Sequence, residues 1–430
     1  MFKQLIPSYN QEKFLHLRQK RINNPSLQAP VKLSIITQFY PPDYAPTGQL
    51  IEELATHLGH LGMQVQVFTG QPGYAFQKAS APAVERSEKI QVKRSRSARM
   101  WPQRIRGKVV NGLLFCVRSG LHLLKTGSRG DILLITTAPP FLPILGYFAN
   151  LLFRIPYVCL LYDLYPDVAL ELKAINPKNY LVKYWSFLNG CIWKKAKRII
   201  VLSPTMKDRV TAACPEIADK ISVIHSWANP EMIKPIDKEN NWFAHKYNLV
   251  NSFTVLYSGN MGRCHDMDTI LDTAWRLKNE PIKFVFIGDG AKREICIQSA
   301  KDLGLDNCLF LPYQEKQNLS YSLTACDLSL VSISPRMEGL VAPSKLYGIL
   351  AAGRAVAVIC EKHSYLRQLV GEAECGVAFD HGDSKSLAEF VLRLAKDPKM
   401  AQKMGNAGRR YLKSNFTPEI IAKQYMELLT

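Results

Sequence analysis

One short segment, EGLVAPSKLYGILAAGRAVAV, places a lysine where a helix is expected to begin. Pro343 favours the first turn of that helix, Ser344 can cap it and Gly353 can end it. Lys345 then lies beside free backbone N–H groups, where a cation is unfavourable by roughly a few tenths of a kcal/mol or more. A bound anion would remove that cost. Gly348 lies on the same face, where a closely approaching ligand or backbone would explain a glycine, and so would core packing.

Loops that follow predicted strands also suit a phosphate ligand. In FYPPDYAPTGQLIEEL a helix begins near Gly48, and its N-terminus can attract an anion, although an ordinary turn explains the glycine equally well. In YSGNMGRCHDMDTIL, Gly259 and Gly262 allow an unusual backbone path, and Arg263 offers a fork of donors suited to a diphosphate. The segment FIGDG, which contains Gly288, predicts only a tight turn.

Carboxylates follow two of the predicted strands. Asp163 comes after YVCLLY, at the edge where a parallel sheet presents side chains to a ligand. It can serve as a catalytic acid or base, or hold neighbouring backbone as a structural carboxylate. Asp266 and Asp268 have the spacing of a metal–nucleotide site, but both precede the helical pattern TILDTAWRL. We therefore expect them to cap that helix rather than to bind a metal.

These loops need a framework of parallel strands. Buried-strand patterns such as KLSIITQFY, DILLITT and YVCLLYD alternate with helical patterns, and the series restarts near Phe253 with FTVLYSG. Such alternation predicts two doubly wound α/β domains whose loops face a shared cleft. We expect a charged, loosely ordered extension at 1–30, a first domain at 31–228 and a second at 229–415. The last helical pattern, 416–430, completes the second domain or crosses back to the first.

Charge indicates an anionic partner. The chain has 430 residues and a formal net charge of +19, and the stretch Lys93–Arg129 holds ten Lys or Arg and no acid. This field suits anionic lipid, nucleic acid or a phosphorylated substrate, and a solvated basic face is the plain alternative. The spacing of apolar residues within the stretch predicts a helix with one apolar face. They recur at every fourth position, at Ile105, Val109, Leu113, Val117 and Leu121.

Other features limit the class of protein. The uncharged run at 132–153 is long enough for a membrane span, but its three prolines favour a strand, a turn and a helix. The ten cysteines lack the spacing of a disulfide framework or a zinc site, so we expect reduced thiols. The first thirty residues do not have the pattern of a signal peptide.

Together these motifs resemble the glycosyltransferases of family 4, which have the two-domain GT-B fold. The resemblance runs from about Val31 to the C-terminus. It rests on FYPPDYAPTGQ, LGMQVQVFTG, YDLYPD, YSGNMGRCHDMDTI, FIGDG, EGLVAPSKLYGILAAGRAVAV, ECGVAFDHGD and FTPEIIAKQYMELL, in this order. The chain is most similar to the transferases that build colanic-acid and O-antigen polysaccharides. The resemblance implies that the helix at 416–430 packs back onto the first domain.

The resemblance also implies a nucleotide-sugar donor held mainly by the second domain and an acceptor held by the first. Arg263 and Lys345 would neutralise the diphosphate, and Gly48 would lie over it from the first domain. Glu338 would hydrogen-bond the sugar hydroxyls, and we expect Glu338 and Asp163 to be the catalytic residues. The other expected donor-binding residues are Gly259, Asn260, Gly262, Gly288, Tyr313, Gly339, Leu340, Val341 and Ser344.

Three positions depart from the family pattern. The usual motif has two glutamates separated by seven residues, whereas here the connection after Glu338 is longer and Gly348 stands where the second glutamate is expected. That glutamate commonly binds the ribose. A frequent Gly-Gly pair is replaced by Thr47-Gly48. Asp163 stands where many members carry a histidine, so it is either a sugar contact or an acid/base partner.

The sequence therefore predicts a retaining glycosyltransferase of cell-surface polysaccharide biosynthesis. It would use a UDP- or GDP-sugar, no cofactor and no metal, and act on a lipid-linked or polysaccharide acceptor. We expect a cytoplasmic protein, peripheral to the inner membrane, bound to anionic lipid through Lys93–Arg129 and an apolar helix at 141–153. One alternative is a nucleotide-sugar epimerase of the same fold. Another is a basic membrane- or nucleic-acid-binding protein, although few aromatics interrupt the basic stretch and we expect no nucleic-acid partner.

Overall fold

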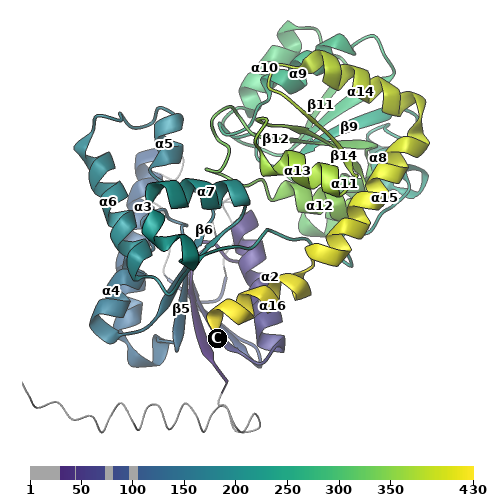
Figure 1. Cartoon of the computed structure of the whole chain (residues 1–430). Coiled ribbons are helices and arrows are strands. Elements are labelled where there is room, and N and C mark those ends of the chain that lie inside the picture. Colours follow the sequence, from purple (N-terminus) through teal and green to yellow (C-terminus); the bar gives the residue numbers. More distant parts are fainter. Residues whose placement is uncertain (1–29, 44, 73–80, 96–104) are drawn as a thin grey trace, which may run out of the picture.

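The computed structural model describes residues 30–43, 45–72, 81–95 and 105–430. Two α/β domains lie next to each other and are joined by crossing segments (Figure 1). The predicted extension at 1–30 lies outside the described residues except for Pro30, as does part of the basic stretch Lys93–Arg129.

The first domain is built on one sheet whose described strands run in the order β3-β4-β2-β1-β5-β6-β7-β8. Neighbouring strands are parallel except for β3 and β4. Residues of β5 and β6 are buried throughout, as expected for a parallel sheet covered by helices on both faces. The strands are β1 (Lys32–Ile36), β2 (Gln64–Thr69), β3 (Val84–Arg86), β4 (Ile90–Arg94), β5 (Ile132–Thr136), β6 (Tyr157–Leu161), β7 (Arg198–Val201) and β8 (Ile221–Val223).

Helices of the first domain connect these strands. The run at 132–153 folds as predicted, into β5, a turn and a helix. No helix within the described ranges is both long and apolar enough to cross a membrane. The helices are α2 (Pro46–His60), α3 (Ile105–Leu124), α4 (Ile144–Phe153), α5 (Asp167–Glu171), α6 (Tyr180–Lys195) and α7 (Pro204–Ala213).

The second domain contains a parallel sheet in the order β11-β10-β9-β12-β13-β14. The prediction of two doubly wound α/β domains is therefore confirmed. The strands are β9 (Phe253–Ser258), β10 (Ile282–Ile287), β11 (Cys308–Leu311), β12 (Leu328–Ser332), β13 (Ala355–Ile359) and β14 (Gly376–Phe379). The helices are α8 (Trp242–Lys246), α9 (Asp268–Arg276), α10 (Arg293–Asp302), α11 (Leu319–Thr324), α12 (Lys345–Ala352), α13 (Tyr365–Glu372), α14 (Ser384–Lys396) and α15 (Pro398–Asn415). The last helix of the chain is α16 (Pro418–Leu429).

Two crossings join the domains. The chain leaves β8 through a segment that includes Ala228, and it returns after α15 at Phe416. The N–H of Ala228 donates to the carbonyl of Phe416 at 3.3 Å, so the crossings touch. Helix α16 then packs against α2 in the first domain, where Figure 1 shows it in yellow.

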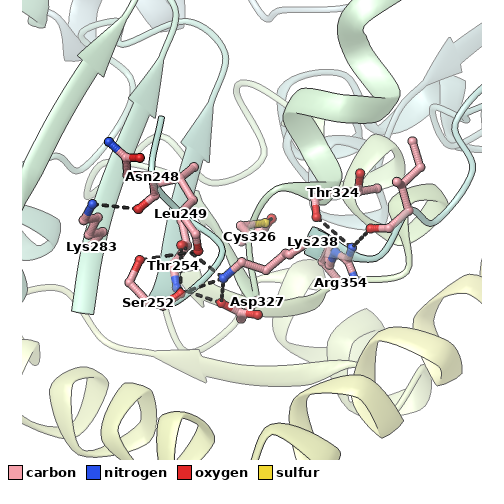
Figure 2. Close-up of polar contacts among 12 residues, drawn as sticks. Lys238, Asn248, Leu249, Ser252, Thr254, Lys283, Thr324, Cys326, Asp327 and Arg354 are labelled. Carbon is pink, nitrogen blue, oxygen red and sulfur yellow. Dashed lines mark hydrogen bonds and ion pairs between the residues drawn. The ribbon is translucent and has the colours of Figure 1, made fainter. Parts of the chain in front are cut away.

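The segment 230–251 lacks a clear period in the sequence, yet it is held firmly against the second domain (Figure 2). Lys238 Nζ lies 2.8 Å from a carboxylate oxygen of Asp327. Arg354 donates to two backbone carbonyls at 2.6 and 2.7 Å. Apolar contacts hold the segment as well, since Phe243, Ala244 and Leu249 are buried in the core.

The apolar face predicted for residues 105–121 exists, but it points outward. In α3, Val109, Leu113, Val117 and Leu121 are all exposed, with Val117 62% exposed. The opposite face, which includes Phe115, packs on the core. The period predicted the helix correctly. It could not show which face is buried, because α3 is apolar on both sides.

Candidate functional site

A cavity of about 580 Å³ lies between the two domains, where the carboxyl ends of strands from both sheets meet. Its first-domain wall includes Asp163 after β6 and the inner face of α2. The second-domain wall includes Gly259 after β9, Tyr313 after β11 and Lys345 at the start of α12. The cleft predicted from the strand pattern is therefore present.

Lys345 presents an unpaired cation to this cavity. Its Nζ is buried, has no hydrogen-bond partner within the described residues, and lies 3.8 Å from the centroid of the Tyr257 ring. Burial lowers the pKa of Lys345 from its ordinary value of 10.5 to about 7. Lys345 is also the first residue of α12, beside the positive end of the helix. The Tyr257 ring stabilises this charge in part, and an anion in the cavity would supply the ion pair that is lacking among the described residues.

The ends of α12 differ in how well the sequence predicted them. Gly353 ends the helix in the left-handed conformation, with φ 65°, as expected. Ser344 precedes the helix, but its backbone is already helical and its side chain makes no capping bond, so the predicted cap is wrong. In the first turn, the N–H of Tyr347 donates to the Ser344 carbonyl at 3.2 Å and the N–H of Leu346 to the Pro343 carbonyl at 3.4 Å. Ser344 also lines the cavity.

Gly348 also lines the cavity. A Cβ added there would lie 3.6 Å from Leu323 Cδ1 and 4.0 Å from Ile233 Cδ1, which are ordinary contact distances. Close approach of the backbone therefore does not explain this glycine. The missing side chain leaves additional space in the cavity between these two apolar residues.

Asp163 lines the cavity on the first-domain wall, whereas Lys345 lies on the second-domain wall. Asp163 is half-buried, and this burial raises its pKa from 3.8 to about 6. The N–H of its neighbour Leu164 donates to the carbonyl of Leu340 at 3.0 Å, so the two domains are in backbone contact beside this carboxylate. Asp163 is thus a half-buried acid that is mostly ionised at neutral pH and lies within the cavity wall.

Glu338 lies outside the lining of the cavity, at the contact between the domains. Its Oε1 accepts a hydrogen bond from Thr205 Oγ1 of α7 at 2.7 Å. Its Oε2 is buried without a partner within the described residues. The predicted bond to a sugar hydroxyl would use this free oxygen, and the role stays a prediction.

The three residues after Glu338 lie in different surroundings. Gly339 is in the left-handed region, with φ 74°, and a Cβ there would lie 2.6 Å from the Thr205 carbonyl oxygen. The N–H of Leu340 is already donated to Met337 O at 3.0 Å, so in this structure it is not available to a phosphate. Val341 lines the cavity as expected.

Only some residues of the loop after β9 line the cavity. Gly259 and Asn260 line the cavity, and Gly259 lies against the Lys345 side chain. Gly262 is buried but outside the lining. Arg263 is exposed and also outside it. The position of Lys345 therefore supports its predicted role in binding the diphosphate, whereas the position of Arg263 does not support the same role.

Two further glycines shape the walls without touching the cavity. A Cβ at Gly288 would overlap the backbone oxygen of Gly259, so the β9 and β10 loops pack directly on each other beside Tyr313. A Cβ at Gly48 would lie 2.9 Å from backbone atoms of Phe39 and Tyr40. Gly48 is therefore required by a close turn. Its neighbours in α2, and not Gly48 itself, line the cavity, and its predicted place over the diphosphate stays a prediction.

Of the two acids after the β9 loop, Asp266 caps a helix as predicted and Asp268 does not. Asp266 accepts from the N–H of Thr269 at 3.0 Å and from the Thr269 hydroxyl at 2.7 Å. Asp268 is the first residue of α9 and is exposed. Across the described parts of the chain, no three His, Cys, Asp or Glu residues gather in a group that could hold a metal.

Sequence reasoning missed Glu53, a buried acid on α2. It lines the cavity and accepts a 2.6 Å hydrogen bond from Trp227 Nε1 on the crossing segment. Burial raises the pKa of Glu53, and the bond from Trp227 opposes this. Helical period would have found it, because Pro46, Gln49, Leu50 and Glu53 recur on one face and all line the cavity.

His265 was missed as well. It lines the cavity, and its Nδ1 lies 2.8 Å from the carbonyl oxygen of Ser332. Burial, and then the nearby charge of Lys345, lower the pKa of His265 to about 3. His265 is therefore neutral at physiological pH, and Lys345 is the buried cation on this wall.

The arrangement suits transfer of a group from an anionic leaving group. A cation and a helix N-terminus on one wall can stabilise departing negative charge. A carboxylate on the opposite wall can stabilise positive charge at the reacting carbon or accept a proton.

Comparison with known families agrees with this geometry. Residues 47–231 match the family model described as Glycosyltransferase Family 4. Residues 239–411 match the model described as Glycosyl transferases group 1. The two matches fall on the first and second domain respectively and together cover most of the chain.

Individual proteins give the same result. The chain is 25% identical over 328 residues to the probable glycosyltransferase WbjE of Pseudomonas aeruginosa, covering 74% of this chain and 78% of WbjE. It is 28% identical over 176 residues to the putative colanic acid biosynthesis glycosyl transferase WcaI of Escherichia coli, covering 41% and 42%. The crystal structure of Anabaena HepE in complex with UDP and glucose has a similar fold, with a TM-score of 0.69, 16% identity and coverage of 93% and 99%.

Proposed function

The chain belongs to the glycosyltransferases of family 4, and from that membership we propose that it moves a sugar from a UDP- or GDP-sugar to a lipid-linked or polysaccharide acceptor. One observation carries this proposal: the buried Nζ of Lys345 at the N-terminus of α12 lines the interdomain cavity and has no hydrogen-bond partner in the described parts of the chain. A sugar diphosphate supplies the anion that this position lacks. The UDP and glucose bound by HepE are consistent with such a donor.

The donor diphosphate would lie between Lys345 and the first turn of α12, and these groups would stabilise it as it leaves. Lys345 would hold its proton more strongly once the diphosphate is bound, because an opposite charge favours the ammonium form. The charge needed at the leaving group would then come from this side chain, and we propose that the reaction needs no divalent metal.

Asp163 would act on the other side of the reacting carbon. The developing positive charge of an oxocarbenium-like centre would be stabilised by its carboxylate. We propose retention of anomeric configuration, which the family implies. In a front-face reaction Asp163 would orient the acceptor hydroxyl, whereas in a double displacement it would be the nucleophile.

We also propose a place of action. The similarity to WcaI, whose name refers to colanic acid biosynthesis, favours assembly of a cell-surface polysaccharide. Its lipid-linked acceptor would lie at the cytoplasmic face of the inner membrane, where the basic stretch Lys93–Arg129 would attract anionic lipid.

Thermal denaturation with UDP, GDP and their sugar conjugates tests the donor proposal. Ligand at a hundred times its dissociation constant stabilises the folded protein by about 2.7 kcal/mol, so the cognate nucleotide should raise the Tm by several degrees. The same shift should persist in EDTA and disappear in Lys345→Met. If no nucleotide raises the Tm of the wild-type protein, the proposed function is wrong.

A further inference from the structure

The first domain has an outer face of unusual polarity, formed by α3, α4 and α6. Among the described residues, twelve of the nineteen exposed large apolar side chains lie on these three helices. Helix α4 packs against both α3 and α6, and Figure 1 shows the group on the flank that faces away from the second domain. This outer face is therefore one continuous surface rather than scattered exposed residues.

Each of the three helices contributes a stripe. On α6, Tyr180, Tyr184 and Phe187 recur at one helical face, and Phe187 is 65% exposed. On α4, Leu151 and Leu152 are adjacent and Leu152 is 64% exposed. The α3 stripe is the outward face described above. A helix that turns its apolar stripe away from the core needs another partner to bury it.

Helices α3 and α6 carry basic residues, of which Lys194 of α6 is paired with Glu216 at 2.9 Å. Helices α3, α4 and α6 contain no Asp or Glu, and the stretch 172–207 contains eight Lys or Arg and no acid. In a symmetric pair the same patch meets itself, so basic residues would face basic residues. A second copy of this chain is therefore disfavoured. A surface that is both apolar and anionic at its boundary, such as a lipid bilayer, complements it.

Two arginines of the basic stretch, among the residues that the structure describes there, are engaged within the protein. Arg94 is buried and pairs with Glu85 at 2.7 Å. Arg129 donates to the carbonyls of Leu123 and Leu124, each at 2.7 Å, at the end of α3. Because these guanidinium groups are engaged, we expect apolar contact to contribute more to membrane binding, relative to electrostatic attraction.

The outer face is also connected to the cavity. Tyr165, which lines the cavity, stacks on Trp185 of α6, with ring centroids 6.0 Å apart. Asn189 of α6 donates to the carbonyl of Tyr165 at 2.7 Å. The inner face of α6 thus supports the cavity wall while its outer face is exposed.

We propose that the outer face of α3, α4 and α6 inserts into a lipid bilayer by apolar contact, with α6 setting the position of the cavity relative to the membrane. This deepens the proposed function, because it names the surface that brings the lipid-linked acceptor to the cavity. It differs from purely electrostatic attachment through Lys93–Arg129, which high salt would reverse.

Vesicle flotation with the full chain tests the proposal. We would use vesicles of phosphatidylcholine alone and with added phosphatidylglycerol, each at 0.1 M and about 0.5 M salt, where exposed charges are strongly screened. Binding to both vesicle types should persist at high salt. The double variant Leu152→Glu/Phe187→Glu should bind at least tenfold more weakly. The matched control is Ile295→Glu on α10 of the second domain, where the side chain is 63% exposed, and it should bind as the wild type does.

Four results would overturn the proposal: no flotation, flotation that high salt abolishes, equal binding by the double variant, or a lipid-free dimer that the double variant converts to monomer. The double variant should retain the nucleotide-induced rise in Tm, which shows that it is folded with an intact cavity. A protein that floats as expected but responds to no nucleotide would contradict the proposed function and leave the membrane surface standing.

Discussion

Each of the two walls of the cavity holds a charged side chain, and the two charges differ in the ligand or reaction state that would stabilise them. Lys345 on the second domain is a cation beside the positive end of α12, with a pKa lowered to about 7. Asp163 on the first domain is a carboxylate with a pKa raised to about 6. A donor diphosphate would stabilise Lys345 on binding, whereas the positive charge that would stabilise Asp163 arises only during reaction. The walls therefore predict separate effects on binding and on turnover.

Replacing Lys345 should have the largest effect. Lys345→Met removes the cation that faces the leaving group, and we expect kcat/KM to fall by roughly 10²- to 10³-fold, as for loss of one preorganised donor. The Tm of the free protein should rise, because a buried charge without a partner is removed. Arg263→Met is the control, since Arg263 is exposed and outside the cavity lining. Equal losses in the two variants would contradict the assignment.

Asp163→Asn should affect turnover and spare binding. We expect kcat to fall about 10²-fold, with little change in the dissociation constant of UDP or GDP. The raised pKa also makes ionised Asp163 unfavourable for folding, by about 3 kcal/mol at neutral pH. The folded protein is therefore more stable when Asp163 is protonated. This contribution to stability is fully present below pH 3.8 and is lost as the pH rises through about 6.

The stability advantage of Asp163→Asn should accordingly grow between about pH 4 and 6 and stay constant above that range. Urea denaturation across this range measures it. A variant that is less stable than wild type at pH 7.5 would show that the ionised carboxylate is paired in solution.

Donor affinity should depend on pH through Lys345. The diphosphate pairs with the ammonium form, so affinity should be constant below pH 7 and fall by up to about tenfold per unit above it. The fall should end at the higher pKa of the bound state. Calorimetric titration with a nucleotide-sugar in buffers of different ionisation enthalpy should show proton uptake. Lys345→Arg should lose this pH dependence, since arginine keeps its charge.

Two glycines, one behind each wall, should respond in opposite ways to alanine. In Gly48→Ala the new Cβ meets backbone of Phe39 and Tyr40 at 2.9 Å, and we expect a loss of about 1–3 kcal/mol in the free energy of unfolding. In Gly348→Ala the Cβ has room, and the better helix propensity of alanine should contribute up to about 1 kcal/mol. Chemical denaturation of both variants compares them directly. Destabilisation by Gly348→Ala would imply tighter packing than the structure shows.

Several parts of the site followed from the sequence, because short-range patterns determine them. The strand ends, the Asp266 cap and the start of α12 each depend on a few neighbouring residues. Short edge strands such as β3 and β8 were not predicted, since three residues carry too little period. Glu53 was overlooked because an acid in an amphipathic helix ordinarily faces solvent.

The surroundings of two other predicted site residues depend on distant contacts, and their roles stay predictions. Arg263 has the donors for a diphosphate, but its loop leaves it exposed. Glu338 was expected in the cavity, and its carboxylate instead bonds to Thr205, 133 residues away in the chain. The local sequence around Glu338 does not predict which domain the loop after it will contact.

The sequence by itself determined the alternation of strands and helices, the positions of the loops and the presence of Lys345 at a helix start. Only the tertiary structure decided whether each charge has a partner and which apolar face is buried. Arg94 is paired by Glu85 from an adjacent strand, whereas Lys345 has no carboxylate partner among the residues described. The α3 stripe has a perfect helical period and yet faces outward. The physical reason is that period and capping are local, whereas burial and charge pairing depend on segments brought together by the fold.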